Sequence, residues 1–594
     1  MEINATVEEK SPRTPKQKPA TPWSVSRDVL IALALVLATV YLLKTNTGIA
    51  QWAQIYDPTG RWWLSTIVAG LPVILLLGAM AVFRVAAHTA AAIGLLTSLI
   101  AAIAVFHMPT RMALTTTVYG AGYGLFPICW IILPVIYLYQ LTVKTGRFEA
   151  LEKTLTQITD DSRLQLLLIA FALGAFFEGT AGFGTPVAVC GALLISLGFD
   201  PIDAAGLSLI ANTAPVAFGA LGIPIVALHG VTGISLPVLS RTIATILVPF
   251  CVLVPFWLIW VYAGFRRMLE VWPAILVAGV TFSVTQYLMA AYVGAGLVDI
   301  TAAALTIAVL VAFLRVWKPK HVLSTARQEI TGASRERVGL GGGAIFKAWL
   351  PWLILSVVVF AWGIPQISKW MSTATINLPV AGLHNLVDSV PPVSNASAPI
   401  SASFTFNWLA ATGTGIFVAS LLAGLAMGLG PGTLVREFVK TTYNIRFAIA
   451  TIAGMLALGF VMRYSGQDAT LGLAFARTGV LYPFFGTLIG WVGTAATGSD
   501  TSSNVIFGSL QQVTAHQIGV PQSLMASANS AGGVMGKMIS PSSIVVASTV
   551  TETYGQEGTI LRYVLQHSVA MAVLVGVLVY LMAYVQPFTA LVAR

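Results

Sequence analysis

The chain has 594 residues, of which 57% are hydrophobic and only 9% charged, and its mean hydropathy is +0.84. Soluble domains carry roughly 25% charged residues, so this composition excludes a water-soluble globular protein and indicates a multi-pass membrane protein in contact with lipid. The net charge of +10 does not indicate a nucleic-acid partner, because the Lys and Arg residues lie in short segments between apolar runs.

Residues 1–50 are predicted to form a polar, basic cytoplasmic tail followed by an additional transmembrane helix. The apolar run at 29–43 follows a long charged leader and is not followed by the small-residue pattern of a cleavage site. We therefore expect an uncleaved spanning helix rather than a secretory signal peptide.

Apolar runs suited to the ~20-residue helix that crosses a bilayer continue along the rest of the chain. They begin near residues 29, 64, 86, 125, 164, 242, 273, 297, 349, 413, 444, 480 and 562. Polar and glycine-rich stretches interrupt other apolar segments, so the sequence predicts an all-α protein with about 12 to 14 crossings. The polar stretch 366–405 is expected either outside the membrane or lining a cavity.

A basic segment at 315–348 divides the spans into a first half, 51–314, and a second half, 349–594. Loops rich in Lys and Arg are retained on the cytoplasmic side, so we expect this segment there. The same rule places the basic loops that contain Lys144, Arg147, Lys153, Arg163, Arg266 and Arg267 on that side.

The two halves share a weak internal repeat. "GTAGFGTPVAVCG" (179–191) and "ANTAPVAFGALGIP" (211–224) have counterparts in "ATGSDTSSNVIFG" (496–508) and "ANSAGGVMGKMISP" (528–541). We interpret them as two repeated, inverted halves with interrupted or re-entrant helices. Matching interruptions indicate a transporter's binding site, because backbone freed from helical hydrogen bonds must be buried in protein or line a cavity.

The first interrupted motif carries Glu178, in a segment otherwise suited to lipid. An acidic side chain at a helix centre in a membrane costs roughly 2.5–3.5 kcal/mol, which predicts that water, a proton or a partner reaches it. Gly179, Gly182 and Gly184, followed by Pro186, favour a broken helix with exposed amides. The alternative is a glycine-rich helix-packing seam with Glu178 at a helix end.

The second motif places Asn212 and Thr213 just before Pro215. Asn and Thr are good N-terminal caps and Pro fits a first helical turn, so this pattern predicts the start of a half-helix. The positive end of such a half-helix attracts an anion. A simple proline kink is the alternative.

The third motif contains six consecutive polar residues, from Ser499 to Asn504, and includes Asp500. Asp500 can exchange a proton, and its neighbours can form many hydrogen bonds; a loop in water at the membrane edge is the alternative. The fourth motif carries Lys537, which is expected to neutralise a substrate carboxylate, to pair with Glu178 or Asp500, or to extend from a helix end towards water.

Other chemistries lack sequence support. Cys129, Cys190 and Cys251 lie in apolar surroundings without CxxC spacing, and the histidines lack metal-ligand spacing, so neither a disulfide framework nor a metal site is expected. The glycine-rich runs lack the Lys-Ser/Thr of a P-loop, and no GxSxG motif is present. We therefore expect neither an enzyme nor a cofactor.

Five stretches together resemble the bacterial L-lactate permease family. They are "YDPTGRWWLS" (56–65), "GAFFEGTAGFGTPVA" (174–188), "NTAPVAFGALGIPI" (212–225), "TGSDTSSN" (497–504) and "GGVMGKMISPSSI" (532–544). The resemblance implies a symporter of the bacterial cytoplasmic (inner) membrane that carries L-lactate, and often D-lactate and glycolate, together with protons. The family pattern has Glu, Asp and Lys at the positions of Glu178, Asp500 and Lys537. The first fifty residues, and Arg463 in place of an uncharged residue, depart from it.

The resulting hypothesis is import of a 2-hydroxycarboxylate with a proton. Glu178 is the first candidate for the proton, because a carboxyl group removed from water binds a proton more readily, and Asp500 is the second. Sodium coupling is an alternative, and a non-transporting carboxylate receptor is another; the sequence does not specify an oligomeric state. The expected substrate-binding residues are Thr180, Gly182, Gly184, Thr185, Asn212, Thr213, Ser499, Thr501, Ser502, Ser503, Asn504, Asn529, Ser530, Lys537 and Ser540.

Overall fold

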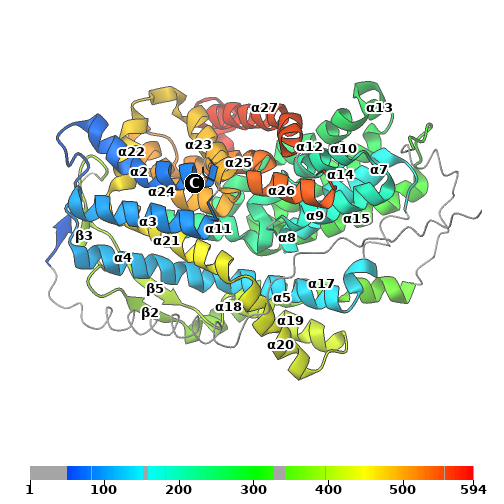
Figure 1. Cartoon of the computed structure of the whole chain (residues 1–594), viewed down its shortest axis with the longest axis horizontal. Helices are drawn as coiled ribbons and strands as arrows, with labels where there is room; N and C mark the ends of the chain where they lie inside the picture. Colours follow the sequence, from blue (N-terminus) through cyan, green and yellow to red (C-terminus); the bar gives the residue numbers. More distant parts are fainter. Residues whose placement is uncertain are drawn as a thin grey trace, which may run out of the picture.

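The structure is a computed structural model that describes residues 50–592, apart from 82, 84, 151–157, 181, 183, 325–341, 395 and 554–555. Within the described residues, 11 helices are long and apolar enough to cross a membrane, and a bent pair makes 12 if it counts as one span. The predicted all-α, polytopic fold is confirmed (Figure 1). The helix expected near residue 29 and much of the basic segment 315–348 lie outside the described residues.

The first half opens with a short strand and then a long helical rod. The bounds are β1 (Trp52–Ala53), α2 (Trp62–Ala81), α3 (Ala87–Ala104) and a rod made of α4 (Thr110–Tyr123), the π-helix η1 (Gly124–Cys129) and α5 (Trp130–Lys144). The span expected near residue 125 thus begins earlier. Gly120 and Gly124 in it serve close packing, and the span is kinked just after them at Phe126, whose φ of −139° and ψ of 121° are not helical. A Cβ on Gly120 would lie 2.7 Å from Cα of Ala457, in helix α21 (Arg446–Ser465).

A series of shorter, interrupted helices follows. Their bounds are α7 (Ser162–Leu166), the π-helix η2 (Leu167–Leu173), α8 (Gly174–Thr180), α9 (Thr185–Leu197), α10 (Pro201–Ala211), the short 3-10 helix η3 (Val216–Phe218) and α11 (Gly219–Thr232). The helices on either side of residues 212–215 are bent by 63°. The span Ser162–Thr180 is 100% buried, which places it at the centre of the bundle rather than against lipid.

Longer spans complete the first half. They are α12 (Leu236–Ala263), the short α13 (Phe265–Leu269), α14 (Trp272–Leu288) with the π-helix η4 (Met289–Val293), and η5 (Ala295–Leu297) leading into α15 (Val298–Val316). Figure 1 shows α14 and α15 at the opposite end of the molecule from α2 and α3.

Three loops that the sequence assigns to the cytoplasmic side meet at one buried arginine. Arg163 is 1% exposed and pairs with Asp161 at 2.7 Å and with Glu270 at 2.8 Å. Its guanidinium also donates to the backbone carbonyls of Arg267 and His321, at 2.8 and 2.6 Å. These loops therefore lie at the same end of the molecule, as one-sided retention of basic loops requires.

The second half begins with α17 (Gly342–Gly363), which is followed by the polar segment expected either outside the membrane or along a cavity. This segment contains α18 (Pro365–Met371), η6 (Ser372–Ala374), β2 (Ile376–Pro379), β3 (Val387–Ser389), β4 (Ala398–Pro399) and β5 (Ser403–Phe406). Strand β3 pairs in parallel with β1, in register Trp52↔Val387, and antiparallel with β4. Strands β2 and β5 form a second, antiparallel pair. None of these strands contributes to the cavity described below.

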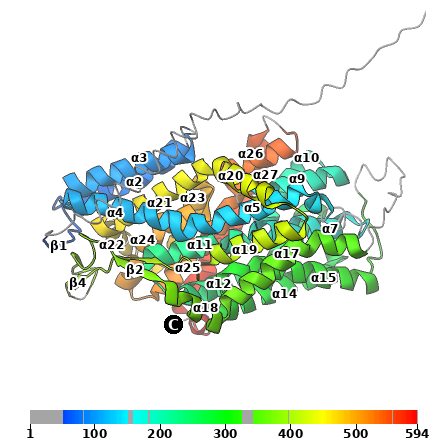
Figure 2. The same cartoon turned by 90° about the horizontal axis from the view of Figure 1, so that it is seen from below.

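The remaining helices surround the second pair of interruptions. They are α19 (Thr412–Ala426), α20 (Pro431–Asn444), α21, α22 (Gln467–Ala476), η7 (Gly479–Leu481), α23 (Tyr482–Thr497), α24 (Asp500–Ile518), α25 (Gln522–Gly536), η8 (Lys537–Ile539), α26 (Pro541–Val550), α27 (Glu557–Tyr584) and η9 (Phe588–Leu591). In Figures 1 and 2, α11, α24 and α25 lie between the two ends of the molecule.

Glycines bring α23 and α25 into backbone contact. A Cβ on Gly490 would lie 2.0 Å from the carbonyl oxygen of Asn529, and a Cβ on Gly532 would lie 2.1 Å from that of Thr487. Small residues allow membrane helices to approach in this way. The contact keeps the C-terminal ends of α23 and α25 close together. The two interruptions of the second half begin at these ends.

Large apolar side chains cover the outside of the bundle. Leu96 and Ile100 on α3 are 60% and 67% exposed, and Val357 on α17 is 67% exposed. Exposed apolar surface of this extent is expected where helices face lipid. The polar chemistry of the protein is therefore concentrated inside the bundle.

Candidate functional site

The chain leaves regular helical geometry at four places that face one another. Two belong to the first half, between Thr180 and Thr185 and at residues 212–218. Two belong to the second half, at residues 498–499 and 537–540. Residues from all four interruptions line one cavity of about 50 Å³. Its lining consists of Glu178, Gly182, Val216, Gly219, Ala220, Ile223, Pro224, Gly498, Ser499, Asp500, Thr501 and Lys537.

Six of these residues are among those singled out in the sequence: Glu178, Gly182, Ser499, Asp500, Thr501 and Lys537. The others were missed because they are apolar or glycine and carry no side-chain chemistry of their own. Five of them lie in the 212–225 motif, so the motif indicates the right segment but not the residues that contact the cavity.

Backbone strain marks the wall formed by α11. Ala220 and Leu221 have φ values of 44° and 58°, and Gly222 has a φ of 78°. Residues other than glycine rarely adopt this left-handed region, and each instance costs on the order of 1–3 kcal/mol. Such strain is concentrated at functional sites, where the surrounding structure maintains it.

Glu178 projects from α8 and is 5% exposed. Its Oε1 lies only 2.6 Å from the position that a Cβ on Gly219 would occupy, so glycine is required there for the carboxyl group to lie against the backbone. Its Oε2 has no hydrogen-bond partner among the described residues. The carboxyl group is therefore held by packing and not by hydrogen bonds on both oxygens.

Asp500, in contrast, accepts three side-chain hydrogen bonds. The donors are Ser530 at 2.6 Å, Asn504 at 3.3 Å and Thr494 at 3.4 Å. Ser499 caps the start of α24 by accepting a bond from the backbone N–H of Ser502. Asp500 thus sits at the positive end of a helix with donors around it, an arrangement that stabilises a carboxylate.

Lys537 donates to the backbone carbonyl of Gly498 at 2.6 Å, across the two interruptions of the second half. It interacts electrostatically with both Glu178 and Asp500. No ion pair between described residues includes it. An ammonium group has three donors, so Lys537 can bind a ligand anion while it holds the carbonyl.

A polar network behind Asp500 contains further predicted residues. Asn504 donates to the carbonyl of Pro224 at 3.2 Å, which links the second half to α11. Asn529 donates to Asn504 at 3.0 Å, and Ser503 donates to the carbonyl of Gly490 at 3.1 Å. These side chains position the cavity wall without lining it.

The remaining predicted residues lie at helix ends beside the cavity. Thr180 is the last residue of α8, Gly184 and Thr185 start α9, and Ser540 caps α26 by accepting a bond from the N–H of Ser543. Gly184 has a φ of 85°, a value that favours glycine. None of these four lines the cavity.

The expectation that Asn212 and Thr213 cap the start of a half-helix is wrong. Asn212 is the residue that follows the end of α10, and the backbone becomes right-handed α-helix again only after the left-handed residues Ala220 to Gly222 of α11. Helix α10 stops here because Pro215 lacks the N–H that would bond to the carbonyl four residues earlier. The buried side chain of Asn212 interacts with the Glu178 carboxyl group, and the Thr213 hydroxyl is buried without a partner among the described residues.

The repeat also diverges at this point. Asn529, the counterpart of Asn212, lies inside α25, which continues to Gly536. The second half has Gly532 where the first half has Pro215, so α25 can extend past Asn529. The first interruptions of the two halves, by contrast, occur at matching places.

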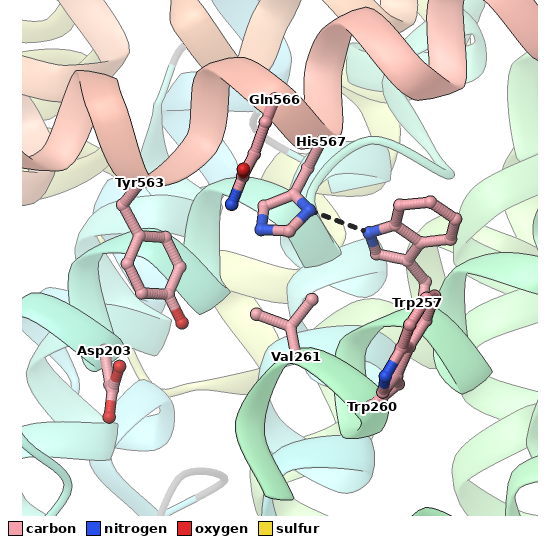
Figure 3. Close-up of a pocket in the computed structure, with 7 residues that line it drawn as sticks. All are labelled: Asp203, Trp257, Trp260, Val261, Tyr563, Gln566 and His567. Atoms are coloured by element: carbon pink, nitrogen blue, oxygen red, sulfur yellow. Dashed lines mark hydrogen bonds between the residues drawn. The ribbon is translucent and has the colours of Figure 1, made fainter. Parts of the chain in front are cut away.

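A separate cavity of about 420 Å³ lies between α10, α12 and α27. Figure 3 shows Asp203, Trp257, Tyr563 and His567 directed towards it, with the Trp257 indole donating to His567 Nδ1 at 3.2 Å. It contains none of the residues that the sequence motifs indicate. Among the described residues, no three His, Cys, Asp or Glu side chains gather as metal ligands, here or elsewhere.

Comparison with known proteins gives consistent matches along almost the whole chain. The sequence profile described as L-lactate permease matches residues 65–586. Glycolate permease GlcA of Escherichia coli (strain K12) is 44% identical over 551 residues, covering 90% of this chain and 98% of that protein. The L-lactate permease of Bacillus subtilis (strain 168) is 41% identical, with 90% of this chain and 99% of that protein covered. The L-lactate permease of Escherichia coli (strain K12) is 40% identical, with 90% of this chain and 98% of that protein covered.

Proposed function

Because the chain belongs to the L-lactate permease family, we propose that it is a secondary active transporter that imports L-lactate, D-lactate and glycolate together with protons. It is a multi-pass protein of the bacterial cytoplasmic membrane, and its relatives carry the names of permeases for lactate and for glycolate.

One observation supports the location of the substrate site: all four helix interruptions contribute to the same cavity. The first turn of α24 and the ammonium group of Lys537 offer positive potential to a carboxylate. The hydroxyl groups of Ser499 and Thr501 offer partners for the substrate's own hydroxyl group. The cavity, of about 50 Å³, is small and lined by polar groups, which suits a small hydroxy acid.

The two acidic residues receive different roles. Burial disfavours the ionised form of Asp500, but hydrogen bonds from three side chains and the nearby ammonium group of Lys537 oppose that cost, so Asp500 is assigned a negative charge beside Lys537. Glu178 has one carboxyl oxygen without a partner, so it can gain and lose a proton without breaking a network. Lactate is an anion at neutral pH, and one proton on Glu178 makes the loaded site neutral when the protein changes conformation.

Alternating access requires the two halves to move relative to each other around this site. The interruptions suit such motion, because broken helices can change angle without unfolding a complete span. Lys537, which bridges the two interruptions of the second half, couples substrate binding to their geometry.

The test is uptake of labelled L-lactate by purified protein in proteoliposomes, under an imposed inward gradient of either protons or sodium. Proton symport predicts accumulation on the proton gradient and competition by glycolate. Glu178→Gln should abolish accumulation but retain exchange of labelled for unlabelled lactate. The control Glu149→Gln makes the same change at an exposed position and should behave as wild type. Accumulation on a sodium gradient alone would overturn the proposed coupling.

A further inference from the structure

Asp299 is a second buried carboxyl group beside the candidate site, in a place that the sequence motifs do not indicate. It lies in the first turn of α15 and is 1% exposed. Neither of its carboxyl oxygens has a hydrogen-bond partner among the described residues. Among the described residues, the side chain of Gln286 is the neighbour that favours the charged form of Asp299, and because it is a neutral amide it compensates only in part for a buried negative charge.

The backbone of α8 places Asp299 next to Glu178. A Cβ on Gly179 would lie 2.7 Å from Cβ of Asp299 and 3.0 Å from the backbone nitrogen of Ile300. Glycine at 179 thus allows the start of α15 to pack directly against the turn that carries Glu178. The two carboxyl groups interact electrostatically, each disfavouring the charge of the other.

The other groups around Asp299 are neutral. Gln286 on α14 accepts a hydrogen bond from the thiol of Cys251 at 3.0 Å, and its side chain also interacts with the Asp299 carboxyl group, where it favours the ionised form. The π-helix η2, which also packs against α15, contributes only apolar side chains. The titratable residue of α11 is His229, near the far end of that helix, and that of η4 is Tyr292, which is 79% exposed.

Lys537 completes the charge distribution. It interacts with Glu178 and Asp500, which leaves Asp299 as a buried acid that no cation compensates among the described residues. Burying an ionised carboxylate costs several kcal/mol unless it is paired. Two buried carboxyl groups that interact disfavour double ionisation, so the arrangement favours a proton on one of them.

We propose that Asp299 is a second proton-carrying residue of the transporter, which exchanges the coupled proton with Glu178. In the transfer, the O–H bond of the Asp299 carboxyl group breaks and an O–H bond forms on Glu178, or the reverse, with no other change in bonding. Glu178 lines the cavity, and the next residue, Gly179, packs against Asp299, so the proposed transfer connects the substrate to a proton store outside the cavity. This inference rests on the proposed proton symport.

The matched substitution Asp299→Asn replaces the acid by a neutral group of the same shape. In proteoliposomes, the Asp299→Asn variant should exchange labelled for unlabelled L-lactate at a rate within roughly twofold of the wild-type rate. This change is smaller than the tenfold change that corresponds to 1.4 kcal/mol. Proton-driven accumulation should fall by roughly tenfold or more, the factor that corresponds to a one-unit change in proton affinity. Asp299→Glu should restore part of the accumulation, and the control Asp388→Asn, outside the spans, should have no effect.

Infrared difference spectroscopy of the full-length protein supplies a second readout that does not depend on transport. The carbonyl stretch of a protonated carboxylic acid should be present in the wild type and reduced in the Asp299→Asn variant. If the wild type is driven by protons and the Asp299→Asn variant accumulates lactate equally well with an unchanged carbonyl band, the role of Asp299 is overturned. The proton symport itself would stand in that case. Accumulation of lactate by the wild type on a sodium gradient only would instead overturn the proton symport itself.

Discussion

Replacing Gly219 by alanine tests whether the position of the Glu178 carboxyl group matters for transport. The backbone angles at Gly219, φ −58° and ψ 153°, are accessible to alanine, so the change introduces no backbone strain. The new Cβ would lie 2.6 Å from Glu178 Oε1, and ordinary contact begins at 3.4 Å. The carboxyl group must therefore retreat by roughly 0.8 Å, a displacement similar to those that reduce the rate of enzyme reactions by about a hundredfold.

The effect on folding should be small by comparison. Overpacking costs about 1–3 kcal/mol, and the clash involves the end of a flexible side chain, which favours the low end of this range. Alanine also reduces the conformational entropy of the unfolded chain, which stabilises the folded state by about 0.4–1 kcal/mol. We therefore expect the melting temperature of Gly219→Ala to stay close to that of wild type while proton-driven lactate uptake falls by about a hundredfold.

The assay is uptake of labelled lactate by proteoliposomes with equal amounts of each variant, together with thermal unfolding in detergent. Gly558→Ala is the control, because Gly558 is exposed in α27 and a Cβ there meets nothing within 4 Å. That variant should transport as wild type. Wild-type uptake by Gly219→Ala, with an intact fold, would refute the claim that the close approach of Glu178 to this backbone serves transport.

Three further predictions concern residues outside the cavity. Arg163→Met leaves buried Asp161 without its partner and should lower the free energy of unfolding by about 3–5 kcal/mol, measured as a loss of thermal stability. Arg163 donates to Glu270 and so holds the pKa of that carboxyl group below its ordinary value. The stability that this pair gives the folded protein is fully present above the ordinary pKa of Glu and is lost as the pH falls through the lowered pKa of Glu270. Glu270→Gln should therefore weaken the decline in melting temperature towards acid pH, and an unchanged decline would contradict this pairing. Arg463 donates to the carbonyl of Val231 at the end of α11, so Arg463→Gln should cost about 0.5–1.5 kcal/mol in stability and leave the ratio of lactate to glycolate uptake unchanged.

Local composition predicted several of the features that form the site. Glycines around Glu178 and the polar run after Gly498 cannot continue a lipid-facing helix, and the structure has interruptions at both places. The role expected for Asn212 is wrong, because a polar residue followed by proline is compatible with either the start or the end of a helix. The packing of the following segment, with positive φ at Ala220 and Leu221, determines which occurs.

The meeting of the four interruptions could not be predicted from composition, because it depends on contacts between distant parts of the chain. The backbone contact of α23 with α25, made possible by Gly490 and Gly532, is one such contact. Asp299 was missed for a different reason. It is a lone acid in an apolar run, as Glu178 is, and Gly294 and Gly296 precede it, but no proline or polar run follows as it does after Glu178.

An experimental structure of the protein with bound L-lactate would test the central claim most directly. We predict that the substrate occupies the cavity between Glu178, Ser499 and Lys537, with its carboxylate towards Lys537 and the first turn of α24. Lactate bound instead in the larger cavity between α10, α12 and α27, beside Trp257 and His567, would contradict the assignment of the transport site to the helix interruptions.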